Sequence, residues 1–278
     1  MKTKNLLLIL SICVCGGVSG QAAVIAYYRA EGTNGSQIGS TITDSSGNGR
    51  DITVSGATAS DKYLNKVAND PSPIPQTGAT NTTMLNIDTK GTNPGGTLSL
   101  TAASNVAWNH IFEKQAFTIE GWISPSDYLF GSNIEVAGRG NVYGTGWQLL
   151  VYRLSNTSVA FGFKTAGSFY NMTVTGLTNG MMDYFSVIGQ ANGDVNLSYA
   201  GQTGTILSAA YAASTDTTSS LYFFQGEKTG NFQVDEVRFS DTALSSGQLL
   251  NVVPEPSTWA LLAFSLTTVT VLRRRRGN

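Results

Sequence analysis

The sequence predicts an all-β fold, an antiparallel sandwich or barrel. Short apolar runs recur along the chain from Val24, and residues such as Gly, Asn and Asp separate them. Long amphipathic helical patterns are missing from the middle of the chain. The length of 278 residues suits one such domain, or at most two small ones. No repeat of 20 to 50 residues is visible, which disfavours a propeller or a solenoid.

The first 23 residues predict a secretory signal helix. Two lysines precede an apolar stretch from Leu6 to about Val18, and small residues follow at an expected cut after Ala22 or Ala23. The stretch is short for a membrane anchor. Both cysteines of the chain lie in this segment, so its removal leaves a mature protein without thiols or disulfides.

The predicted strands follow the signal in order. Phe117, Ile119 and Ile123 share one face of a strand while Thr118 and Glu120 share the other, which predicts a half-buried strand. Residues 147–154 are apolar on both faces, which predicts a central strand. Residues 61–96 contain several prolines and predict a long irregular connection. The candidate strands are VIAYYR, DITVSG, TLSLTA, AFTIEGWI, GWQLLVYRL, SVAFGFK, FYNMTVTG, YFSVIGQ, DVNLSYA, LYFFQG and FQVDEVRF.

The charge of the central region argues against a nucleic-acid partner. Once the basic residues of the two ends and Glu255 are set aside, 11 of the 17 basic and 17 of the 18 acidic residues remain, a net charge near −6. Proteins that bind nucleic acid usually present a basic surface. An acidic surface instead suits an extracellular domain, and it favours cations over anions.

The C-terminal segment combines a two-proline turn, an apolar run and an arginine cluster. The prolines flank Glu255 in Pro254-Glu255-Pro256 and keep the segment extended, and residues 259–272 are apolar. Such a run is short for spanning a bilayer, but a thin or transient span is possible. The chain ends with four consecutive arginines, which would hold that end in the cytoplasm: Arg273, Arg274, Arg275 and Arg276.

This order of features resembles the PEP-CTERM sorting signal. The resemblance implies a protein that is exported in Gram-negative bacteria, is held transiently in the inner membrane by a hydrophobic helix, and is cut near Pro254-Glu255-Pro256 by an exosortase. It also implies association with exopolysaccharide or the cell surface. The alternative is an ordinary C-terminal anchor that follows a proline linker.

Four stretches of the central region, in order, resemble the laminin-G-like (LamG-like), concanavalin A-like family. They read AYYRAEG, TDSSGNGRDITVSG, AFTIEGWISP and FQVDEVRFSDTALSSGQLL. The resemblance implies an antiparallel two-sheet jelly-roll sandwich with its first and last strands close together, used more often to bind glycans or proteins than for chemistry. The expected organisation is therefore a signal peptide over residues 1–23, a LamG-like domain over residues 24–251 and a sorting segment over residues 252–278.

A structural calcium ion is one prediction for this domain. Asp44 and Asn48 lie in a glycine-containing turn where their oxygens can converge, although Ca²⁺ takes six to eight oxygen ligands. The family resemblance adds Asp235, and the apolar phase shifts at Asp235-Glu236, which predicts a β-bulge. The alternative is that Asp44 caps the turn and that Glu236 and Arg238 form surface ion pairs.

The sequence does not predict an enzyme. Laminarinase-type glycosidases of this fold carry a Glu-x-Asp-x-x-Glu triplet, and the sequence has none. Glu120 stands alone beside Trp122, and the single histidine, His110, cannot build a multi-histidine metal site. No glycine-rich phosphate loop joins a strand to a helix, so nucleotide binding has no support.

The loop GRGNVYGTGW gives the best ligand-binding prediction, with Arg139, Asn141 and Tyr143. Sugars stack on aromatic rings while polar neighbours bond their hydroxyl groups. Trp122 and Trp147 are expected in the core. The sequence thus predicts an exported, non-enzymatic protein of the cell surface or polysaccharide layer with a glycan-binding domain. The alternatives are a structural or adhesive matrix protein that binds proteins and, less favoured, a glycoside hydrolase.

Overall fold

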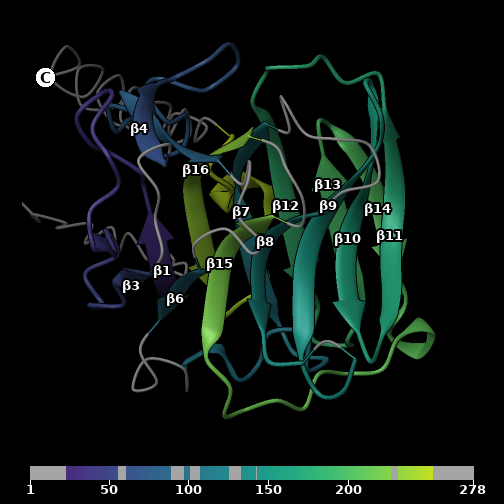
Figure 1. The fold of residues 1–278 in the computed structure, drawn as a ribbon. Coiled ribbons are helices and arrows are strands. Elements are labelled where there is room, and N and C mark those ends of the chain that lie inside the picture. The colour runs from purple at the N-terminus through teal and green to yellow at the C-terminus, as the bar shows by residue number, and fades with distance from the viewer. Residues whose placement is uncertain are drawn as a thin grey trace, which may run out of the picture.

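The structure is a jelly-roll sandwich of two antiparallel sheets, which confirms the predicted fold class (Figure 1). This computed structural model describes residues 23–55, 61–88, 97–100, 107–124, 133–141, 143–226 and 231–252. The signal segment before Ala23 and the sorting segment after Val252, including the two predicted terminal helices, lie outside the described residues. Within the described ranges no helix has the length and apolar character needed to cross a membrane.

Sheet A contains the strands nearest both ends of the described chain. β1 (Val24–Tyr28) pairs with the second half of β16 (Asn231–Ser240), as expected for first and last strands that lie together. The order of the other strands around β16 is β14 (Gln202–Ile206), β13 (Val195–Tyr199), β12 (Asp183–Gly189), β7 (Phe117–Ser124), β16, β5 (Thr83–Asp88) and β4 (Lys62–Asn65).

Sheet B faces the viewer in Figure 1 and packs over sheet A. Its strand order is β11 (Ser168–Thr175), β10 (Ser158–Thr165), β9 (Trp147–Ser155), β8 (Asn133–Arg139), β15 (Leu221–Gly226), β6 (Thr97–Leu100), β3 (Ile52–Ser55) and β2 (Thr41–Ile42). Two short 3₁₀ helices, η2 (Ser208–Ala210) and η3 (Ser246–Gln248), lie in the connections.

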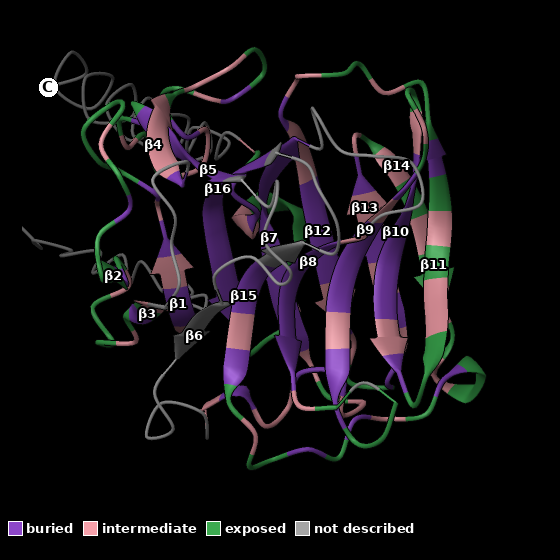
Figure 2. Cartoon of the chain, in the orientation of Figure 1, coloured by how far each residue is buried: buried purple, intermediate pink, exposed green. Residues whose placement is uncertain are grey.

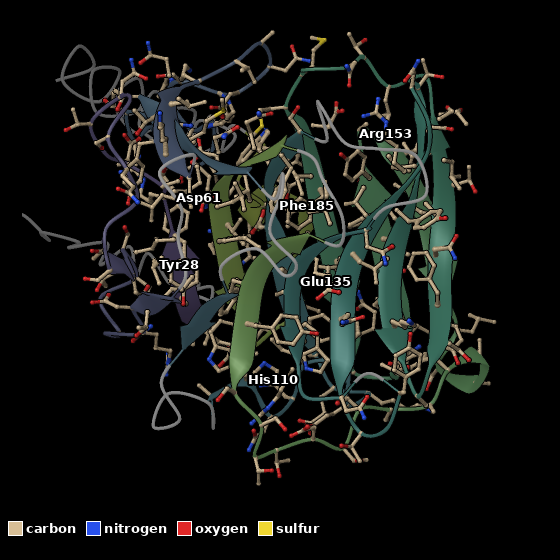
Figure 3. All side chains as sticks on the ribbon, viewed as in Figure 1. Tyr28, Asp61, His110, Glu135, Arg153 and Phe185 are labelled. Atoms are coloured by element: carbon tan, nitrogen blue, oxygen red, sulfur yellow. The ribbon has the colours of Figure 1, made fainter. Side chains whose placement is uncertain are left out.

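The main core lies between the sheets and is rich in aromatic side chains. Trp108 contacts Phe223 and Phe239 edge to face, with ring centres 5.8 and 4.6 Å apart. Trp147 is buried here, as predicted. Tyr28 and Phe185, labelled in Figure 3, belong to the same core at separate places across the sandwich.

A second, smaller core covers the outer face of sheet A. It unites Ile74 from the proline-containing connection, Trp122 from β7 and Leu250 from the C-terminal turn with Met84 and Met182. Every residue of β7 is therefore buried, and the prediction that this strand is half-buried is wrong. The prediction of a wholly irregular connection over residues 61–96 is also wrong, because β4 and β5 lie within it.

The predicted β-bulge in β16 is confirmed. Asp235 pairs with Trp122 of β7 and Arg238 pairs with Glu120, so the register shifts between them. Glu236 has a φ of 51°, in the left-handed region. On its other side β16 pairs with β5 up to Val234 and with β1 from Val237 onward. The bulge therefore lies where one neighbouring strand ends and the other begins.

Candidate functional site

Tyr143 is the most exposed aromatic side chain among the large apolar residues that the structure describes, with 74% of its surface accessible. Asn141 holds the turn, since its side-chain oxygen accepts the Tyr143 N–H at 2.9 Å and its carbonyl accepts the N–H groups of Gly144 and Gly146. Lys164 lies over the ring, 4.4 Å from its centre, with its ammonium 3.3 Å from the phenol oxygen. The ring is thus presented to solvent in a defined orientation.

Outward-facing side chains of neighbouring strands in sheet B form a surface together with Tyr143. Lys164 of β10 pairs with Gln148 of β9 and Phe169 of β11, and all three alternate with inward-facing core residues. Asn171 faces outward on β11, whose residues are half-buried or exposed over most of its length (Figure 2). We refer to Tyr143, Gln148, Lys164, Phe169 and Asn171 as the Tyr143 surface.

Arg139 is not part of this surface. Its side chain is fully buried, with the guanidinium donating to the Ser219 carbonyl at 3.1 Å and to the Asn109 side chain at 2.6 Å, and lying 4.0 Å from the Asp216 carboxylate. Burial lowers the pKa of Arg139. The prediction that Arg139 contacts a ligand is therefore corrected: it supports the turn from inside the sandwich.

The turn that carries Asp44 and Asn48 satisfies its own polar groups. The Asp44 carboxylate accepts the backbone N–H groups of Tyr27, Ser46 and Arg50 at 2.9 to 3.0 Å. These bonds lower the pKa of Asp44 even though burial raises it. Asn48 donates its amide to the Val24 and Ile25 carbonyls. Asp44 is a turn cap, the alternative raised by the sequence, and this turn does not fit a calcium ion.

Asp235 lies elsewhere, in a buried cluster with Asp70 and Asn81. The Asn81 amide nitrogen donates to Asp235 Oδ2 at 2.6 Å and to Asp70 Oδ1 at 3.3 Å, and the three residues are 94% buried or more. Asp70 Oδ2 and Asn81 Oδ1 are buried without hydrogen-bond partners. Burial and the nearby carboxylates raise the pKa of Asp235 strongly, and burial raises that of Asp70 to about 6.

The donor types in this cluster are those that a divalent cation would take, although the described residues contain no group of three or more His, Cys, Asp or Glu side chains placed to hold a metal ion. Carboxylate and amide oxygens are the hard ligands that Ca²⁺ takes in proteins, and Asp70 Oδ2 and Asn81 Oδ1 have no other partner here. The Asn81 amide presents its nitrogen to both carboxylates, so it would have to rotate to join them as an oxygen ligand. The residues that would hold a cation are therefore Asp70, Asn81 and Asp235. The sequence analysis missed Asp70 and Asn81 because they lie in the proline-containing connection, where no strand pattern indicates a direction for either side chain.

The carboxylates beside this cluster have partners other than those predicted. Glu236 accepts hydrogen bonds from the Tyr27 hydroxyl and from Arg29 at 3.2 Å, and burial raises its pKa to about 7. Arg238 pairs instead with Glu120, at 2.5 Å. Glu120 is fully buried and also accepts bonds from the Tyr184 hydroxyl and the Leu250 N–H. None of these carboxylates is open to a substrate.

Comparison with known proteins gives likeness of structure only. No family model and no curated protein sequence matches the chain. The solved structures that resemble it include the binding domain of botulinum neurotoxin DC in complex with SialylT (TM-score 0.56, 13% identity) and the same domain in complex with rat synaptotagmin II (TM-score 0.55, 13% identity). Each match covers 82% of this chain and 50% of the other.

A third match is botulinum neurotoxin type C, whose cell entry depends upon interaction with two ganglioside molecules (TM-score 0.52, 13% identity, 80% of this chain and 49% of the other). The chain thus spans about half the length of the structures that it resembles. At these identities the likeness establishes the fold alone: this chain shares a jelly-roll sandwich with part of the binding domain of botulinum neurotoxin DC.

Proposed function

We propose that the chain is an exported, non-enzymatic protein whose sandwich domain binds glycans through the Tyr143 surface. The observation that carries this proposal is the presentation of the Tyr143 ring, 74% exposed and held by Lys164 and Asn141. An aromatic face with an amide and an ammonium beside it suits a sugar ring and its hydroxyl groups. The chain shares its fold with a toxin binding domain in complex with SialylT and with a toxin whose cell entry depends upon interaction with ganglioside molecules, and this likeness supports the same ligand class.

A glycan array on the purified chain tests the proposal. We expect saturable binding that Tyr143→Ala reduces at least tenfold. Leu207→Ala is the matched control, because Leu207 is also an exposed large side chain, 60% accessible, but lies next to η2 rather than on the Tyr143 surface. A blank array from folded protein, or equal losses in both variants, would contradict the proposal and favour a structural or adhesive role with protein partners.

The delivery route is part of the same proposal. The N-terminal signal and the PEP-CTERM-like segment at Pro254-Glu255-Pro256 support export, transient anchoring in the inner membrane and processing by an exosortase-type enzyme, followed by retention at the cell surface or in the polysaccharide layer. A glycan-binding domain released at that place would meet polysaccharide at once.

We also propose that a structural Ca²⁺ ion binds at Asp70, Asn81 and Asp235. The support is the pair of neighbouring buried carboxylates, whose charge a cation would neutralise, together with the unpartnered oxygens of Asp70 and Asn81. Since a ligand that binds only the folded state raises its stability, we expect the melting temperature to rise in calcium and fall in EGTA. Asp70→Asn should remove this difference. Asp44→Asn, which changes a turn cap, should lower stability but keep the calcium effect.

A further inference from the structure

A groove of about 260 Å³ lies on the outer side of sheet A, beside the C-terminal turn. Its described lining includes Tyr27 of β1, Arg238 and Ser240 of β16, Gln76 of the proline-containing connection, and Leu244 and Gln248 near η3. These residues come from four separate parts of the sequence. The Tyr143 surface belongs to the outer face of sheet B, so the groove is a different site.

The floor of the groove is rigid and electrically neutral. Arg238 donates to Glu120 through Nε at 2.8 Å and through Nη2 at 2.5 Å, and Nη2 also donates to the Gln248 carbonyl at 2.6 Å. Glu120 is fixed in turn by Tyr184 and Leu250. Because the carboxylate already neutralises the guanidinium, the groove offers no net charge to attract an ionic ligand.

Polar groups that line the groove are not fully paired within the protein. Ser240 is only 1% exposed, and its buried hydroxyl has no hydrogen-bond partner. Buried polar atoms of this kind are uncommon unless water or a ligand pairs with them. The Gln76 side-chain oxygen meets Arg238 Nη1 at 3.4 Å, a long bond that a ligand hydroxyl would readily replace. The groove therefore presents a hydroxyl, an amide and a guanidinium nitrogen together.

The wall of the groove supplies apolar surface. Leu244 is 93% buried beside it, and the Tyr27 ring is held in place because its hydroxyl donates to Glu236. A fixed aromatic side chain next to hydroxyl and amide groups is the combination that recognises a polyhydroxylated ring. The volume is slightly below the roughly 300–1,000 Å³ of sites for drug-sized ligands, which favours one ring over a chain of several.

We propose that this groove binds a single uncharged sugar ring, with Ser240 and Gln76 bonding its hydroxyl groups and Tyr27 facing its apolar side. The inference adds a second binding site for the ligand class of the proposed function, but it does not depend on Tyr143. A domain with two sugar sites on opposite faces would cross-link polysaccharide strands rather than only attach to one.

The test is saturation-transfer NMR on the full chain with three neutral probes: the methyl pyranosides of glucose, galactose and mannose. We expect at least one to bind with a dissociation constant on the order of 1 mM, as small ligands of this size allow. The methyl glycoside of glucuronic acid, which carries a charge, should bind more weakly. Ser240→Ala and Gln76→Leu should each weaken binding about tenfold.

Ser124→Ala is the matched control, because the Ser124 hydroxyl is also buried without a partner but lies outside the groove. It should leave probe binding unchanged. Absence of a transfer signal from every neutral probe, or equal binding by the groove variants and the parent chain, would overturn the inference. Glycan-array binding that Tyr143→Ala abolishes would still support the proposed function in that case, so the two failures are distinguishable.

Discussion

Buried charged side chains that pair with one another are important for the stability of this domain. Glu120 and Arg238 lie under the second core, with side chains 0% and 9% exposed, and each depends on the other for neutralisation. Removing one member of a buried ion pair typically costs about 3–5 kcal/mol, because the remaining charge is left unpaired in a region without water.

We therefore expect Glu120→Gln to lower the free energy of unfolding by about 3–5 kcal/mol in urea titrations. Glutamine keeps an acceptor oxygen, so the loss reports the charge. Glu31→Gln makes the same chemical change near Arg29, at 3.6 Å, where the Glu31 side chain is 29% exposed, and should cost less than about 1 kcal/mol. Similar losses for the two variants would contradict a special role for the buried pair.

The buried acids predict how stability depends on pH. In the folded protein burial raises the pKa of Asp70 to about 6 and that of Glu236 to about 7, and the pKa of Asp235 is also raised. An acid with a raised folded pKa contributes stability below its unfolded pKa, and this stability is lost as pH rises through the folded value. In EGTA we expect the melting temperature to fall between pH 5 and pH 8.

Calcium should reverse this trend, since the cation needs ionised carboxylates and binds more tightly at pH 8. Scanning calorimetry at the two pH values, with calcium and with EGTA, checks both parts of the prediction. In Asp70→Asn the loss of stability between pH 5 and pH 8 in EGTA should be smaller. A melting temperature in EGTA that rises from pH 5 to pH 8 in the parent chain would contradict the assignment.

The fate of Arg139 illustrates what sequence cannot reveal about a single residue. In β8 the register against β9 shifts between Glu135 and Ala137. In a regular strand Ala137 and Arg139 would face away from the side that Ile134 occupies, but the shift turns both of them to the interior as well. No apolar pattern in GRGNV indicates this shift. Asn141 and Tyr143 lie after the strand, beyond its influence, and Tyr143 is exposed as expected.

At the scale of elements, the bulge in β16 requires a small residue opposite it. Gly121 of β7 lies beside the bulge, and a Cβ there would be 3.0 Å from a Val237 methyl group and 3.1 Å from the Asp235 carbonyl. Such distances are tighter than ordinary van der Waals contact, so a methyl group would push the two strands apart where the Asp235 cluster begins.

We expect Gly121→Ala to lower the free energy of unfolding by about 1–3 kcal/mol, the usual cost of overpacking. Gly247→Ala is the control, since a Cβ at Gly247 meets no atom within 4 Å. Gly121→Ala should also reduce the calcium-dependent rise in melting temperature, because Asp235 lies in the displaced strand segment. A Gly121→Ala variant as stable as Gly247→Ala would show that the strands accommodate the methyl group without strain.

Strand patterns were more informative than the connections between them. The phase shift at Asp235-Glu236 predicted the bulge, because apolar side chains on the two sides of a bulge occupy opposite parities. The segment that covers sheet A was not predicted. Ile74 is fully buried between prolines in a polar sequence, and its burial depends on Trp122 and Leu250, which lie far away in the chain.

At the scale of the whole molecule, the sandwich has two chemically different outer faces. The outer face of sheet A is covered by the second core and closed by the C-terminal turn, whereas that of sheet B carries the Tyr143 surface. The cover of sheet A creates the groove and the Asp235 cluster, and both depend on contacts with residues 66–82. The family resemblance indicated the sandwich fold, but the positions of the groove and the Asp235 cluster followed only from the three-dimensional packing of the chain.

The position of the C-terminal turn makes the sorting proposal testable without disturbing the fold. Leu250 is fully buried, its N–H donates to Glu120, and its carbonyl accepts the Gln76 N–H at 3.1 Å. A chain that ends at Val252 keeps these contacts, so deletion of residues 253–278 should leave the domain folded. If the deleted segment sorts the protein, the shortened chain should appear in the medium and be lost from the cell surface.

Fractionation and immunoblotting of cells that carry each version measure this directly. Glu255→Gln, which keeps both prolines, tests whether the carboxylate of Pro254-Glu255-Pro256 is needed for processing. We expect this variant to stay uncut, so that the immunoblot shows it at the mass of the unprocessed protein. A chain that ends at Gln248 also lacks Leu250. If this chain misfolds, the protein should be degraded rather than released into the medium. Unchanged surface retention of the chain that ends at Val252 would refute sorting by the deleted segment. The signal for retention would then lie in the sandwich domain, and the two proposed sugar sites would be the first candidates for it.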